Sequence, residues 1–343
     1  MKKLSLIIVF IVFFGAFFLT GCTHEVVNLY IYKMPNKLVY NLNEELDLSG
    51  LELKGIKTDS ALTTIYNSSA NFKGFDSTTS GKKEITVSYG KFTTSFTVFV
   101  ANKIVDSEEN IVTTINNASD DDIILIKKGE YNLSSPLEIN NKNLVIGGES
   151  ADKTKLNGFV IIGGYYNDGN ITYSNLSENI SIIGISLNTK STIKNNIISF
   201  DDTKYNYLLA GINAESIKGL KVISCKFTGF ATAIKIKDVE NSFICGNSFT
   251  KLYVGGIEVT NSIKNSTISK NIINNIGKSV VYVNDDNEQQ NIFGIKLAFN
   301  EEENVGVSLY KNSISKIAIK DTKLNFLNKK AEGKFSGLNY MYN

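Results

Sequence analysis

Apolar and polar residues alternate in short runs between residues 26 and 100. The clearest runs are VVNLYIY, LDLSGLEL, KEITVSYG and FTTSFTVFV. Successive side chains of a strand point to opposite faces, so this period of two predicts half-buried β-strands. We expect Gly50 and Gly81 at turns with positive φ, and Gly90 in the hairpin between the last two strands. The pattern predicts a small β-sandwich over residues 22–101.

A different pattern starts after Ala101. Residues 107–118 place Ile111, Val112 and Ile115 on one face, which predicts a short amphipathic helix with Ser107 as its amino-terminal cap. Similar segments then recur about every 22 to 24 residues: GLKVISCKFTGF, ENSFICGNSFTKL, KNSTISKNIINNI and the NNIISF run that ends at Phe200. A repeat of this length predicts a solenoid over residues 102–343, in which each coil buries its apolar face against its neighbours.

Asn247 and Asn271 occupy equivalent places in two of these repeats, and Cys225 takes that place in the preceding one. We expect the asparagines to stack inside the solenoid and to bridge successive coils. Cys225 and Cys245 lie 20 residues apart in adjacent coils. Their offset registers and apolar neighbours favour two buried free thiols, with a disulfide as the alternative.

Composition narrows the chemistry. The chain has 36 lysines against 34 acidic residues, a net charge of +2, no arginine, no tryptophan and a single histidine, His24. The weak net charge argues against a nucleic-acid partner. Chemistry that needs a guanidinium group or a histidine in a folded domain is excluded. The scarcity of proline and the abundance of Ile, Asn, Ser, Thr and Gly indicate an all-β protein.

The sandwich segment resembles the bacterial immunoglobulin-like domains that occur as repeats in surface proteins. The resemblance lies in Tyr40, the run ELDLSGL from Glu45, Phe75-Asp76, Gly81, ITVSYG from Ile85 and the closing FTVFV. It covers about 75 residues. It implies a spacer role, with ligand binding as the less common alternative.

The start of the solenoid resembles the entry segment of right-handed parallel β-helix proteins of the pectate-lyase and pectin-esterase superfold. The matching parts are the predicted helix, the strand at 123–126, Gly129-Glu130-Tyr131 and LVIGG from Leu144. The chain departs from the enzymes of this superfold. It lacks the Gln-rich motifs and arginine of pectin esterases, the Gly-His-Gly run of polygalacturonases and the arginine of the arginine-dependent lyases, which leaves the lysine-based lyases as the compatible enzyme class. The resemblance therefore implies fold more than reaction.

In this superfold the functional face usually runs along the strand that follows each long turn. Here those strands are expected at 211–214, 233–237, 256–260, 280–284 and 306–310. Alternation points Ile212, Ala214, Ile234, Ile236, Ile257, Val259, Val281 and Val283 inward. The outward residues form two columns: Asn213, Lys235, Glu258, Tyr282 and Ser308; and Glu215, Lys237, Thr260, Asn284 and Tyr310.

Lys235, Glu258 and Tyr282 are the catalytic candidates, since coils about 4.8 Å apart would stack them within reach of one another. A lysine with a lowered pKa can act as a general base and a tyrosine as an acid, the pair that β-elimination of a uronate requires. The alternative is a solvated sheet on which such pairs contribute a fraction of a kcal/mol each.

Ligand-binding candidates surround these positions. Lys237 and Asn213 share the two columns, and the loop at 201–207 is expected to overhang the same face with Asp201, Asp202, Tyr205 and Tyr207. The paired carboxylates could hold Ca²⁺, as in some β-helix lyases, and the tyrosines could stack on sugar rings. A soluble turn is the alternative interpretation of the same residues.

The amino terminus combines Lys2 and Lys3 with an apolar stretch from Leu4 to Leu19 and the run Leu19-Thr20-Gly21-Cys22. This resembles a bacterial lipoprotein signal, which implies removal of residues 1–21 and a diacylglyceryl group on Cys22. Acyl chains would anchor the mature protein to the outer face of a bacterial membrane. The alternative is an uncleaved signal anchor.

Two functions follow as hypotheses. In the first, a cell-surface lipoprotein recognises or displays carbohydrate through its β-helix, and the Ig-like domain is a spacer. In the second, the β-helix is a lysine-dependent polysaccharide lyase that acts on uronate polymers.

Overall fold

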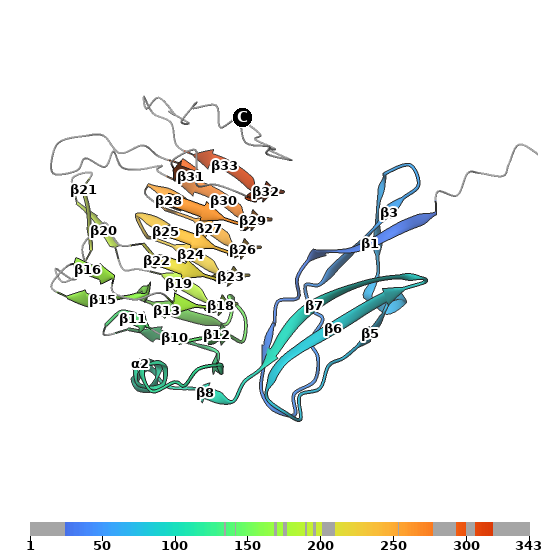
Figure 1. Cartoon of the computed structure of the whole chain (residues 1–343), viewed down its shortest axis with the longest axis horizontal. Helices are drawn as coiled ribbons and strands as arrows, with labels where there is room; N and C mark the ends of the chain where they lie inside the picture. Colours follow the sequence, from blue (N-terminus) through green and yellow to red (C-terminus); the bar gives the residue numbers. More distant parts are fainter. Residues whose placement is uncertain are drawn as a thin grey trace, which may run out of the picture.

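The computed structural model describes residues 25–317 except 134, 141, 168–169, 174–176, 189–190, 195–196, 201–209, 253, 277–292 and 300–305. Two β-rich units lie side by side, a twisted sandwich and a stack of coils (Figure 1). The only α-helix in the described part of the chain is α2 (Glu108–Asn116). The prediction of an all-β protein is confirmed.

The amino-terminal unit is a sandwich of two sheets. One has the order β1 (Val26–Lys33), β3 (Glu52–Lys57), β4 (Leu62–Ile65), and the other β2 (Val39–Tyr40), β7 (Phe92–Val100), β6 (Gly81–Tyr89), β5 (Asn71–Lys73). A short 3₁₀ helix spans Asn67–Ser69. The inward residues of the alternating runs, among them Leu53, Ile85 and Val98, are fully buried. Gly50, Gly81 and Gly90 all have positive φ, as predicted.

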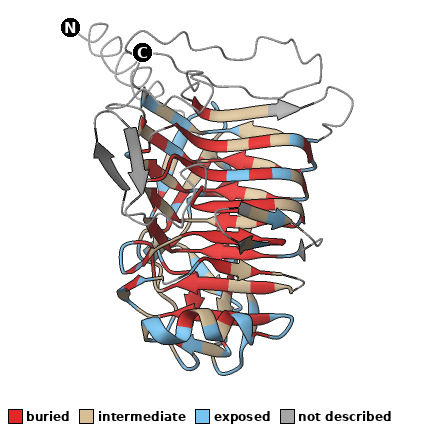
Figure 2. Cartoon of the chain, turned by 90° about the vertical axis from the view of Figure 1, so that its left-hand side faces the viewer, coloured by how far each residue is buried: buried red, intermediate tan, exposed pale blue. Residues whose placement is uncertain are grey.

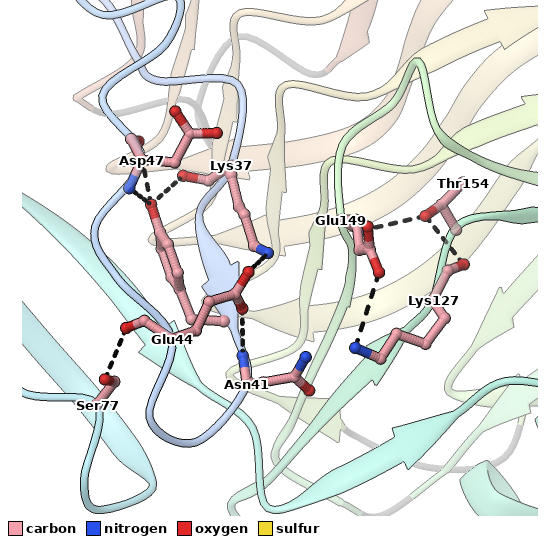
Figure 3. Close-up of polar contacts among 9 residues, drawn as sticks. Lys37, Asn41, Glu44, Asp47, Ser77, Lys127, Glu149 and Thr154 are labelled. Carbon is pink, nitrogen blue, oxygen red and sulfur yellow. Dashed lines mark hydrogen bonds and ion pairs between the residues drawn. The ribbon is translucent and has the colours of Figure 1, made fainter.

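The loop between β2 and β3 is fixed by polar contacts. The carboxylate of Glu44 pairs with Lys37. The backbone carbonyl oxygen of Glu44 accepts a hydrogen bond from Ser77 Oγ at 2.7 Å. The buried Tyr40 hydroxyl lies 3.1 Å from the carbonyl oxygens of Lys37 and Asp47, and burial raises the pKa of this phenol. Figure 3 shows these contacts, together with those of Lys127, Glu149 and Thr154 in the first coils of the second unit.

The second unit is a parallel β-helix with three long sheets, each built from one strand per coil. The docking sheet contains β8 (Lys103–Val105), β9 (Asp122–Ile126), β12 (Leu144–Gly148), β18 (Ser181–Ile183), β23 (Lys221–Ile223), β26 (Phe243–Cys245), β29 (Thr267–Ser269) and β32 (Ser308–Tyr310). The third sheet contains β10 (Gly129–Asn132), β13 (Thr154–Asn157), β19 (Ser186–Asn188), β24 (Lys226–Thr228), β27 (Ser248–Thr250), β30 (Ile272–Ile276) and β33 (Ser313–Ile317).

The remaining sheet, here the lysine sheet, contains β11 (Leu137–Ile139), β14 (Val160–Ile162), β22 (Ile212–Lys218), β25 (Thr232–Glu240), β28 (Gly255–Lys264) and β31 (Phe293–Phe299). The short β17 (Ser177–Glu178) pairs with the end of β22. Two hairpins branch from the coils: β15 (Gly164–Asn167) with β16 (Asn170–Tyr173), and β20 (Ser191–Lys194) with β21 (Ile197–Phe200). The last four residues of the NNIISF run, Ile197–Phe200, thus form a hairpin strand, which corrects their assignment to the coil repeat.

Stacked apolar side chains fill the inside of the coils, which Figure 2 shows as a column of buried positions. Phe227 and Phe249 stack in adjacent coils with their ring centroids 5.0 Å apart. Helix α2 lies at the first coil and buries Ile111 and Ile115 against this core (Figure 1). Ser107 occupies the predicted cap position, but its side chain makes no capping hydrogen bond.

An asparagine ladder runs between the docking and third sheets. Asn271 Oδ1 accepts hydrogen bonds from the backbone N–H and the side-chain Nδ2 of Asn247, both at 3.0 Å. Asn247 Oδ1 in turn accepts from the Cys225 N–H at 2.9 Å. The predicted ladder is confirmed, and Asn312 extends it by one coil, 2.9 Å from Asn271 Nδ2. Cys225 and Cys245 are buried free thiols, as expected.

The two units share an apolar cluster. Val39 and other sandwich residues pack with outward-facing residues of the docking sheet, namely Ile123, Leu125, Val145, Ile183 and Ile223. A Cβ at Gly147 would lie 2.3 Å from Val39 Cγ2, so the backbone of β12 touches the sandwich directly. The predicted boundary near residue 101 falls between β7 and β8. Independent folding of residues 22–101 and 102–343 stays a prediction.

Candidate functional site

The candidate site is the outer face of the lysine sheet. Parallel pairing aligns β22, β25 and β28 residue by residue, so alternation separates inner from outer side chains. The described residues expected to point inward are all buried: Ile212, Ala214, Ile234, Ile236, Ile257 and Val259. This part of the prediction is confirmed.

The outward residues form two columns. In the first, Asn213 aligns with Lys235, then with Glu258 and Lys296; in the second, Glu215 aligns with Lys237, Thr260 and Ala298. We call the polar members of this face the polar strip: Glu215, Lys235, Lys237, Glu258, Thr260 and Lys296. These residues lie on different coils, and the parallel pairing of the strands brings them to one face.

Two ion pairs cross the polar strip. Lys237 Nζ lies 2.7 Å from Glu215 Oε1, and Lys296 Nζ lies 2.8 Å from Glu258 Oε1. Lys235 is exposed and forms no ion pair with any residue that the structure describes. Within the polar strip three lysines face two carboxylates, so Lys235 has no carboxylate partner among the described residues.

One lysine of the strip, Lys237, has a shifted pKa. The hydrogen bond that Lys237 donates to Glu215, and then the negative charge of that carboxylate, raise the pKa of Lys237. Lys237 is therefore fully protonated at neutral pH. Tyr173 lies close enough to Glu215 for the carboxylate to act on it: burial, and then this negative charge, raise the pKa of Tyr173 to about 12.

Tyr173 belongs to the β15–β16 hairpin, which residue patterns alone did not single out. Glu138 on β11 fastens this hairpin by accepting a hydrogen bond from the Tyr166 N–H at 2.8 Å. Asn140 Nδ2 donates to the carbonyl oxygen of Gly164 at 2.9 Å. The signal was present in the sequence as YYNDGNITY, in which a turn segment separates two aromatic strand ends.

Four predicted positions need correction. Asn213 points outward but is only 2% exposed, and its amide is occupied by the N–H and the carbonyl oxygen of Ala210 at 3.0 and 2.7 Å. Lys296 takes the place beside Glu258 that was expected for Tyr282. Ser308 and Tyr310 belong to the docking sheet and pair with β29, so they are no part of either column.

The remaining candidates lie outside the described residues: Cys22, Asp201, Asp202, Tyr205, Tyr207 and Tyr282 itself. Within the described ranges, no group of three or more His, Cys, Asp or Glu side chains converges as a metal site would require. In the same ranges, no helix is both long and apolar enough to cross a bilayer.

The comparisons with known proteins agree with the two units. Residues 34–100 match the family model of the bacterial Ig-like domain, group 3. A stretch of 81 residues is 36% identical to pectate lyase L of Thermoclostridium stercorarium; it makes up 24% of this chain and 6% of that protein.

Solved structures of low sequence identity also align with the chain. The catalytic domain of an α-1,3-glucanase in complex with nigerose aligns with a TM-score of 0.37 at 11% identity, over 86% of this chain and 56% of that one. A family 28 exopolygalacturonase of Yersinia enterocolitica aligns with a TM-score of 0.39 at 10% identity, over 77% and 54% of the chains. The chain thus spans little more than half of these structures and a small part of the pectate lyase. It consists of a bacterial Ig-like domain followed by a right-handed parallel β-helix.

Proposed function

We propose that this protein is a surface lipoprotein that binds an acidic polysaccharide through the polar strip, without catalysis. The observation that carries the proposal is that Lys235 is exposed and has no carboxylate partner among the described residues, whereas Lys237 and Lys296 are both paired. Outward positions on neighbouring strands lie about 4.8 Å apart, so the strip can contact several consecutive sugar units. A uronate chain carries the carboxylates that lysine ammonium groups recognise.

Binding fits the strip better than β-elimination does. Elimination needs an acid beside Lys235, the expected general base. Glu258 is 13% exposed and is paired with Lys296, which takes the place expected for an acidic tyrosine. The lyase remains the second hypothesis because part of the chain resembles a protein named pectate lyase L.

Lys235→Ala is expected to weaken binding of an oligogalacturonate by about 1 to 3 kcal/mol, roughly five- to 150-fold, since the only unpaired cation of the strip is lost. The exposed Lys235 side chain forms no hydrogen bond or ion pair with the described residues, so the free energy of unfolding should not change. Isothermal titration calorimetry measures both affinities. Lys82→Ala, which removes an equally exposed lysine from β6 of the Ig-like domain, is the matched control and should bind like the parent.

Equal affinity of the parent and Lys235→Ala would remove the polar strip from the proposal. Growth of ultraviolet absorbance from unsaturated uronate products, when the parent is incubated with polygalacturonate, would replace binding by elimination. That rise should then disappear in Lys235→Ala and persist in Lys82→Ala.

The location at the outer face of a bacterial membrane rests on the run before Cys22 and is part of the same proposal. We expect the mature protein to begin at Cys22 and to carry lipid there, because acyl chains hold a protein at a bilayer surface. Mass spectrometry of the membrane fraction should find a lipid-modified Cys22 peptide, and Cys22→Ala should accumulate as an unacylated precursor. An unmodified Cys22 in that fraction would contradict the anchor.

A further inference from the structure

A second group of lysines and aromatic rings lies where the Ig-like domain faces the docking sheet. We call Tyr30, Tyr32, Lys54, Lys270 and Lys311 the junction cluster. Lys311 Nζ of the β-helix lies 4.6 Å from the ring centroid of Tyr30 and 6.0 Å from that of Tyr32. Lys54 Nζ lies 5.6 Å from the Tyr32 centroid, and Lys270 Nζ donates to the carbonyl oxygen of Ile31 at 2.8 Å.

The junction cluster holds uncompensated positive charge. None of its three lysines forms an ion pair with a carboxylate of the described chain; Lys54 has Thr64 Oγ1 as its polar partner at 2.8 Å. The neighbouring Glu52 lies within ion-pair distance of Lys33 instead. Half-burial, and then the charge of Lys311, lower the pKa of Lys270. A half-buried cation without a counter-ion is unfavourable, which marks the cluster as a place for an anion.

The turn position of these two lysines does not itself require a lysine. Lys270 and Lys311 have φ values of 56° and 54° and stand directly before the ladder residues Asn271 and Asn312. The equivalent turn positions of earlier coils hold Gly184, Ser224 and Gly246. A left-handed conformation disfavours lysine relative to glycine, so the turn itself does not call for these side chains.

A buried hydroxyl completes the cluster. Tyr30 Oη is buried and has no hydrogen-bond partner among the described residues, while Tyr32 is 42% exposed and Lys311 is exposed. A polar atom left in this way costs free energy until a partner arrives. The cluster therefore offers cations, an unused phenol and an exposed ring within one small surface that both units build.

We propose that the junction cluster is a second binding site for an acidic sugar, in which Lys270 and Lys311 bind the carboxylate beside the exposed ring of Tyr32. The choice of sugar class rests on the proposed function; the site itself does not use the polar strip. A ligand bound here contacts both units, so the Ig-like domain takes part in binding the sugar.

Calorimetric titration of the full chain with tetragalacturonate tests the proposal. The parent should bind at two sites, and in Lys235→Ala one of the two should be weakened roughly five- to 150-fold. Adding Lys311→Gly to Lys235→Ala should weaken the residual binding at least tenfold. Glycine copies Gly246 and suits the positive φ, so the fold should be kept. The contact between Lys270 and Ile31 also remains, and small-angle scattering should show an unchanged arrangement of the two units.

Lys316→Gly is the matched control, since Lys316 is an exposed lysine with a φ of 52° on the third sheet. It should bind like the parent. Unchanged affinity and stoichiometry in Lys311→Gly would overturn the junction site whatever Lys235→Ala does. Loss of binding in Lys311→Gly, with none in Lys235→Ala, would keep the junction site and reject the polar strip. A parent that binds no tetragalacturonate would overturn both.

Discussion

Replacing Asn271 by alanine is expected to lower the free energy of unfolding by about 3 to 5 kcal/mol, among the largest effects of a single substitution. Its side chain is fully buried and serves three coils: Oδ1 accepts two hydrogen bonds from Asn247, and Nδ2 donates to Asn312 and to the carbonyl oxygen of Ile244. Alanine removes the partner of the buried Asn247 N–H, one of the two acceptors of Asn247 Nδ2, and the donor to the Ile244 carbonyl oxygen. Chemical denaturation of the full chain measures the loss.

Asn157→Ala provides the matched control, because the Asn157 amide bonds only to the exposed side chains of Glu130 and Asn132. Its effect should stay within about 0.5 kcal/mol. A similar small loss for Asn271→Ala would mean that water replaces the ladder contacts, and that stacked apolar residues alone hold the coils together.

Gly147→Leu is expected to push the Ig-like domain off the docking sheet. The first atom of the new side chain would lie 2.3 Å from Cγ2 and 2.9 Å from Cβ of Val39, a fully buried residue that cannot swing away. Such overpacking costs about 1 to 3 kcal/mol, and separation would also expose the shared apolar cluster. Small-angle scattering should show a larger radius of gyration, and denaturation should show a lower midpoint.

The control is Thr260→Leu, which adds the same side chain to an outward position of the lysine sheet, away from the sandwich. It should leave the radius of gyration unchanged. An unchanged scattering profile for Gly147→Leu would show that the sandwich accommodates the leucine, and that docking tolerates changes at β12.

Much of the fold could be predicted because every coil of a solenoid meets the same packing requirement. Each coil must bury an apolar face on its neighbours, so the period, the inward aliphatic residues and the asparagine ladder are visible as sequence patterns. The same logic aligned Lys235 with Glu258. It did not extend to Tyr282, because the chain between β30 and β31 is longer than a fixed coil period allows, and loop length on a surface is not set by packing.

Other features of the site depend on what covers a residue rather than on its spacing. Alternation gave the correct side for Asn213, but not the backbone groups of Ala210 that occupy its amide. The sequence of β9 also signals that the sandwich docks on its outer face. The run DIILI is apolar at Ile123 and Leu125 as well as at the inward positions, which is typical of a strand buried on both faces.

The docked sandwich also bears on how the chain folds as it is made. Protein synthesis delivers amino-terminal domains first, and a solenoid grows by adding coils to a structured end. Because Val39 and its neighbours form one cluster with outward residues of β9 and β12, the sandwich presents a ready apolar surface when these strands emerge. We expect it to seed the first coils, so that the β-helix grows in one direction from a template that the chain itself carries.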